Sequence, residues 1–143
     1  MARYKKILVH LDLSQDSEHI AVAARDIAGD SQASMVVLHV VEYLPIEPLG
    51  ESVLPTPQVG DELIDQSRAG LEELIARLAL PRAGIRVQAG NTKAEILRVA
   101  DEESADLIVI GSRERHGLGV LVNFTEDTVL HAAHCDVLTV RLK

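Results

Sequence analysis

The sequence predicts an α/β protein with a single open, five-stranded parallel sheet and helices on both of its faces. Five short runs rich in branched aliphatic residues alternate with stretches of helical periodicity, as in parallel sheets joined by right-handed crossovers. At least three of these runs are apolar almost throughout, which is typical of strands covered on both faces. The length of 143 residues favours one domain over 1–143.

The first half of the pattern is strand, helix, strand. KKILVHL (5–11) and MVVLHVV (35–41) are the two predicted strands. The stretch 15–30 between them has apolar residues at i, i+4, i+7 and i+8, a spacing that places them on one helical face. These residues are Ile20, Ala24, Ile27 and Ala28.

A long connection then leads to the second helix. The segment 43–60 holds four of the five prolines and little periodicity, and connections of this length are usually functional or mobile. A helix is predicted over 61–79. Its apolar stripe consists of Leu71, Leu74, Ile75 and Leu78. IRVQA (85–89) is the third predicted strand.

The rest of the chain predicts two helices and two strands. A helix over 92–103 opens with Thr92-Lys93-Ala94-Glu95, which fits a capping box at a helix start. DLIVIG (106–111) is the fourth predicted strand and VLTVRL (137–142) the fifth. Between them, a helix over about 121–133 would turn Val122, Val129 and Ala133 inward.

Composition narrows the classes of function. The net charge is −8, so the chain lacks the basic surface that drives binding to nucleic acid. The single cysteine, Cys135, rules out an internal disulfide and fits a reducing compartment. No apolar run approaches the roughly 20 residues that a membrane span requires. We therefore expect a cytoplasmic protein that binds neither nucleic acid nor membrane.

Ligands of open parallel sheets bind beyond the carboxyl ends of the strands. The first such turn, HLDLSQDSE, has no glycine, and no G-x-x-x-x-G-K-[ST] occurs, so a dinucleotide fold and a phosphate-loop NTPase are set aside. Asp12 could bind a ribose or a cation there. The interpretation we favour is that Asp12 or Ser14 caps the first helix.

No metal site or catalytic group is predicted. His131, His134 and Cys135 lie close in sequence, but a zinc site normally requires three or four converging ligands, and no fourth is apparent. His10 and His39 fall inside strands, where packing or hydrogen bonding is expected. Ser14, Ser112 and Thr125 lack a recognisable base, so their hydroxyls are not predicted to be nucleophiles.

The order of motifs resembles the universal stress protein family over essentially the whole chain. The motifs are KKILVHLDLS, VVLHVVE, GNTKAEIL, DLIVIGSR and CDVLTV. The resemblance implies an adenine nucleotide alpha hydrolase-like fold with strand order 3-2-1-4-5, and a homodimer in the cytoplasmic stress response. The runs DLSQDS and HCDVLTV resemble the universal stress protein A-like, non-ATP-binding subgroup.

Family members that bind ATP carry G-x-x-G, nine residues and G-[ST] after the fourth strand. Here Gly111 matches the first glycine and Thr125 the hydroxyl, but Glu114 and Phe124 replace the other two glycines. Glycine allows backbone N–H groups to approach phosphate, whereas Glu114 adds bulk and negative charge. The sequence therefore predicts a degenerate nucleotide site. Basic residues in the same loop could offset charge on a phosphate: Arg113, Arg115 and His116.

Two functions follow from the resemblance, and a third stays open. The first is a non-enzymatic stress-response homodimer without a cofactor, which pairs through its last strand and acts on unidentified proteins. The alternative is a protein that binds ATP or AMP, with or without weak hydrolysis. By carry-over from the family, the alternative places adenine near Val40, ribose near Asp12, and phosphates around Gly111 and Thr125. The third is another small ligand, gated by 43–60.

Overall fold

The computed structural model describes residues 3–42, 57–80, 83–113 and 125–142. Five parallel strands form one sheet in the order β3-β2-β1-β4-β5. The strands are β1 (Lys6–His10), β2 (Ser34–Val41), β3 (Ala83–Ala89), β4 (Leu107–Arg113) and β5 (Asp136–Leu142). The helices are α1 (Ser17–Ser31), α2 (Pro57–Leu78), α3 (Thr92–Glu102) and α5 (Thr125–Ala132). The predicted fold class and strand order are confirmed.

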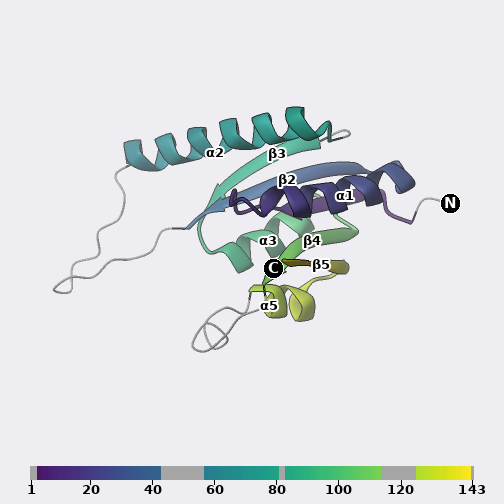
Figure 1. Ribbon diagram of the computed structural model, residues 1–143. Coiled ribbons are helices and arrows are strands. Elements are labelled where there is room, and N and C mark those ends of the chain that lie inside the picture. Colours follow the sequence, from purple (N-terminus) through teal and green to yellow (C-terminus); the bar gives the residue numbers. More distant parts are fainter. Residues whose placement is uncertain (1–2, 43–56, 81–82, 114–124, 143) are drawn as a thin grey trace.

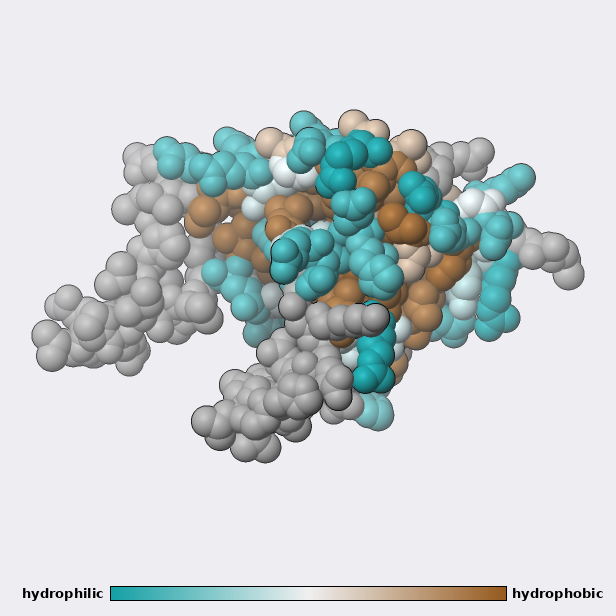
Figure 2. Space-filling model, viewed as in Figure 1, coloured by the Kyte–Doolittle hydropathy of each residue, from teal (hydrophilic) through white to brown (hydrophobic). Residues whose placement is uncertain are grey.

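The helices cover the sheet in two layers, as Figure 1 shows, with α1 and α2 on one face and α3 and α5 on the other. Side chains of β1 alternate between the layers because the strand period is two. Ile7 and Val9 pack with α1 and α2, and Leu8 packs with α3. In Figure 2, hydrophilic side chains cover much of the outer faces of α1 and α2, while apolar side chains show between these helices.

Two helix starts differ from the sequence prediction. α2 begins at Pro57, so 57–60 belongs to the helix and not to the long connection. Proline suits the first helical position. The backbone N–H that proline lacks would have no partner within the helix at that position in any case. α5 begins at Thr125 instead of about 121, and 121–124 lies outside the described residues.

The predicted capping box at Thr92 is wrong by one residue. Asn91 is the N-cap, and its Oδ1 accepts a hydrogen bond from the Ala94 N–H at 3.0 Å. Thr92 is the first helical residue and donates its hydroxyl to Glu42 instead. Glu95 pairs with Arg98 at 2.6 Å and does not turn back to the cap. Asparagine is a stronger N-cap than threonine, which explains the shift.

The start of α1 also corrects the prediction. Its N-cap is Asp16, so neither Asp12 nor Ser14 occupies that position. Asp12 nevertheless stabilises the turn before the helix, because its Oδ1 accepts bonds from the Ser14 N–H at 3.0 Å and the Ser17 hydroxyl at 3.2 Å. Asp12 therefore supports the start of α1 by fixing the turn before it, and not by capping the helix.

Candidate functional site

The candidate site lies where β1 and β4 end side by side in the sheet. The chain leaves β1 for α1 on one face of the sheet, while α5, which follows β4, packs on the other face. Such a divergence opens a crevice beyond the strand ends. The topology brings Asp12, Val40 and Gly111 to this end of three adjacent strands, as the sequence predicted.

Asp12 is an ionised carboxylate at the mouth of the crevice. Partial burial alone would raise its pKa, but the bonds from Ser14 and Ser17 outweigh it and hold the pKa below the usual range. Since both bonds go to Oδ1, they fix the orientation of the group. Asp12 therefore adds a positioned negative charge to the mouth.

The turn between β1 and α1 is strained at Leu13, whose φ is 60°. Few residues other than glycine adopt this left-handed conformation. The Leu13 side chain lies over Gly70 of α2, where an added Cβ would stand 3.6 Å from Leu13 Cδ1. The packing of Leu13 on α2 thus compensates for the strain in the turn that carries Asp12.

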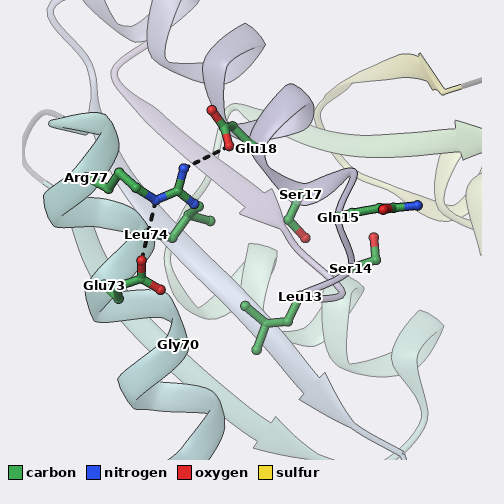
Figure 3. A pocket seen from close by; sticks show the side chains of 9 residues that line it. All are labelled: Leu13, Ser14, Gln15, Ser17, Glu18, Gly70, Glu73, Leu74 and Arg77. Atoms are coloured by element: carbon green, nitrogen blue, oxygen red, sulfur yellow. Dashed lines mark hydrogen bonds and ion pairs between the residues drawn. The ribbon is translucent and has the colours of Figure 1, made fainter.

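A pocket of about 410 Å³ lies beside this turn, between the start of α1 and α2 (Figure 3). Its charged groups satisfy one another, because Arg77 lies 2.8 Å from Glu18 and 3.4 Å from Glu73. Hydrogen bonding to Glu18 is the main cause that raises the pKa of Arg77. The remaining lining residues are Leu13, Ser14, Gln15, Ser17, Gly70 and Leu74. One arginine paired with two glutamates leaves the lining with a net negative charge, which does not favour an anionic ligand.

Glu42, immediately after β2, joins the sheet to the start of α3. Its Oε1 accepts hydrogen bonds from the Thr92 hydroxyl at 2.6 Å and the Thr92 N–H at 3.0 Å. These bonds lower the pKa of Glu42, with the hydroxyl as the largest cause. A carboxylate of the chain thus occupies a helix N-terminus, the kind of position at which phosphate is often bound.

His10 is the last residue of β1, and His39 lies two residues before the end of β2. His39 Nδ1 is 2.9 Å from the Leu11 carbonyl oxygen, which confirms the expected hydrogen bonding. Burial, and then the nearby His39, lower the pKa of His10 to about 4 despite the opposing influence of Asp12 and Glu42. His10 is therefore neutral at physiological pH.

Gly111 is a glycine for a reason that the sequence does not reveal. A Cβ added there would come 2.7 Å from Ile20 Cδ1 and 2.8 Å from Leu142 Cδ1. Both side chains are buried, so the close packing of α1 and β5 on β4 favours a glycine at this point. Its presence is accounted for without a phosphate.

Val40 offers less surface to a ligand than the family pattern implies. The Val40 side chain is only 6% exposed and packs in the core beneath α3 and α5, so it offers little surface to a ligand. Thr125 begins α5, but its side chain lies outside the described part of the chain, as do Glu114 and Phe124. The degenerate phosphate loop therefore remains a prediction.

The histidines near the carboxyl end do not gather around a metal. His134 Nδ1 is 3.2 Å from Asp101 Oδ1, on the surface beside α3. Burial raises the pKa of the Cys135 thiol, which disfavours the thiolate form that binds metals. Across the described residues, no three His, Cys, Asp or Glu side chains are arranged to hold a metal ion. None of the described helices has the length and apolar character needed to span a membrane.

Comparison with known proteins decides the family. The model of the universal stress protein family matches residues 3–141. This chain is a universal stress protein. Universal stress protein A homolog 2 of Coxiella burnetii is 35% identical, covering 100% of this chain and 99% of that protein. Homolog 1 of the same organism is 33% identical, with 98% of both chains covered.

Solved structures of other universal stress proteins share the fold. UspA from Lactobacillus plantarum has a TM-score of 0.72 and 27% identity, covering 99% of this chain and 100% of that one. A universal stress protein in complex with cAMP has a TM-score of 0.69 and 25% identity, covering 96% and 97%. The resemblance inferred from the sequence motifs is thereby confirmed.

Proposed function

We propose that this chain is a non-enzymatic, homodimeric stress-response protein of the cytoplasm that acts through protein contacts, with a crevice that has lost triphosphate binding. The observation that carries the proposal is the charge at the crevice mouth. Asp12 and Glu42 are both ionised there, and His10 beside them is neutral. A triphosphate would have to approach two carboxylates of its own sign.

Lys93 adds a positive charge that acts on Glu42, and its effect there is weaker than the hydrogen bonds from Thr92. Among the side chains that the structure describes at the mouth, this one half-buried lysine cannot offset two carboxylates and the several charges of a triphosphate. The sequence adds a third acid, Glu114, at a position where ATP-binding relatives have glycine. The charge of the described residues and the sequence pattern thus favour the same proposal.

The two edges of the sheet support a homodimer through β5. The β3 edge lies under α2, and its Arg86 pairs with Glu102 of α3 at 2.8 Å. β5 pairs with β4 alone in the described sheet, and Thr139 and Arg141 are exposed along it. An open edge is a liability that pairing with the same strand of a second copy would remove. The strand residues of this proposed interface are Val137, Leu138, Thr139, Val140 and Arg141.

We expect the protein to sediment as a dimer at micromolar concentration. Thr139 lies at the middle of the proposed interface, so Thr139→Lys would bring like charges together across the two-fold axis and weaken dimerisation about tenfold or more. Gln66→Lys adds the same charge on an exposed position of α2 and should leave the dimer unchanged. Sedimentation velocity measures both. A wild-type monomer at micromolar concentration would refute the interface.

The second candidate is a nucleotide-binding protein, favoured by the cAMP complex of a structural relative. Calorimetry with ATP and magnesium separates the two functions, and we expect no heat change at millimolar ATP. A variant that restores both family glycines, Glu114→Gly with Phe124→Gly, should recover binding if those two residues abolished it. Tight ATP binding by the wild-type protein would establish the alternative instead.

A further inference from the structure

We propose that the pocket between the start of α1 and α2 is part of a docking groove for a partner protein. The groove takes an extended segment that carries a leucine and, four residues away, an arginine or lysine. This assignment rests on the proposed function, because it gives the contacts with other proteins a place on the molecule.

The centre of the groove is the pocket of about 410 Å³ beside the turn that precedes α1. Gly70 keeps it open on the α2 side, since a Cβ added there would already be 3.6 Å from Leu13 Cδ1. Leu13 and Leu74 give the pocket an apolar lining. A volume of this size lies within the range of ligand pockets and leaves room for one long side chain.

Leu63 extends the apolar surface along α2 beyond the pocket. It lies seven residues before Gly70, so the two share one edge of the helix and are about 10 Å apart along its axis. Leu63 is 38% exposed, one of two large apolar side chains exposed among the described residues. Apolar side chains between α1 and α2 are visible in Figure 2. The alignment of Leu63 with the pocket therefore offers a partner a second apolar contact.

Arg77 holds two carboxylates at the rim of the pocket. Its guanidinium lies 2.8 Å from Glu18 Oε2 and 3.4 Å from Glu73 Oε1, and Figure 3 shows the two glutamates on either side of it. The other oxygen of each glutamate has no hydrogen-bond partner among the described residues. Both can therefore accept from a cation that enters the pocket. Acceptors that are already oriented lose less freedom on binding than mobile ones.

The charge around the groove favours a basic partner. The lining itself has one arginine against two glutamates. The rest of α1 and α2 carries two arginines and six acidic residues, so the surrounding field attracts the same kind of partner. These acidic residues are Asp26, Asp30, Asp61, Glu62, Asp65 and Glu72.

The distance between the two contacts sets the spacing in the partner. Leu63 lies about 10 to 15 Å along the helix axis from Gly70 and Glu73. In an extended chain, side chains four residues apart point to the same side and are roughly 13 Å apart. A leucine placed on Leu63 thus brings the basic side chain of such a segment into the pocket.

NMR titration of the full-length, ¹⁵N-labelled protein with the peptide acetyl-Leu-Ser-Ser-Ser-Arg-amide tests the groove. We expect saturable amide shifts confined to the neighbourhood of Leu13, Leu63, Gly70 and Glu73, and none with glutamate in place of the arginine. Glu73→Gln and Leu63→Ser should each weaken binding about threefold. Glu72→Gln removes the same charge from an exposed position of α2 outside the pocket and should leave binding unchanged.

Four results would overturn the docking groove. The first is a lack of saturable shifts, and the second is equal weakening by Glu72→Gln and Glu73→Gln, which would reduce binding to general attraction by an acidic protein. Arginine amide that binds as tightly as the peptide would make the pocket a site for small amines. Loss of the dimer in Leu63→Ser would assign the surface to a second copy. The wild-type dimer and ATP binding are measured without the peptide, so failure of the groove is distinguishable from failure of the proposed function.

Discussion

Replacing Gly111 with alanine is expected to lower the free energy of unfolding by about 2 kcal/mol, and replacing it with valine by about 3 kcal/mol or more. The new Cβ would lie 2.7 Å from Ile20 Cδ1 and 2.8 Å from Leu142 Cδ1, well inside contact distance. Ile20 and Leu142 are 4% and 5% exposed, so a shift of either side-chain end to make room would disturb the packed core around it. Urea unfolding monitored by circular dichroism measures the loss.

Gly29 provides the matched control for this substitution. It lies on the exposed side of α1, where an added Cβ meets nothing within 4 Å. Gly29→Ala should therefore stabilise the protein by about 0.5 to 1 kcal/mol through its helix propensity. Leu142→Ala in the Gly111→Ala background should recover part of the lost packing, which would appear as coupling in a double-mutant cycle. Native stability in Gly111→Ala would contradict the packing explanation.

Stability should fall by about 2 to 3 kcal/mol between pH 6.5 and pH 4 because of His10. Its pKa is about 4 in the folded protein and 6.5 in the unfolded chain. Between these values the unfolded state binds the proton and the folded state does not, so unfolding becomes more favourable as the pH falls. Below pH 4 both states carry the proton, and the loss from His10 is complete.

The contribution of His10 has to be separated from that of the carboxylates. Asp12 and Glu42 also have lowered pKa values, so their stabilisation is lost at low pH as well. His10→Leu removes only the histidine part, and its stability should depend less steeply on pH between 6.5 and 4. His19→Gln should keep the wild-type slope. Urea unfolding at several pH values measures this, and an unchanged slope in His10→Leu would contradict the assignment.

The sequence predicted the strands well because burial on both faces leaves a strong local signal. Runs such as 35–41 are apolar almost throughout, and a parallel strand needs no distant information to be recognised. Helix starts were predicted less well, since a cap depends on one residue. Asn91 and Thr92 are both acceptable caps, and only the backbone shows that Asn91 has the extended conformation of an N-cap.

The candidate site was predicted in place but not in detail. Strand ends located Asp12, Val40 and Gly111 correctly, because topology alone brings them to one end of the sheet. The reason for Gly111 involves α1 and β5, which are distant in sequence, so a motif could suggest only a phosphate. The bond between Glu42 and Thr92 likewise joins residues on either side of α2 and β3.

Leu13 has a consequence for any attempt to redesign this protein. The peptide unit that orients Asp12 is held in its unusual conformation by a side chain seated on Gly70 of another helix. The geometry of the crevice mouth therefore depends on how the turn before α1 packs against α2. A designer who wished to give the crevice a new ligand would have to begin on α2, away from the crevice itself.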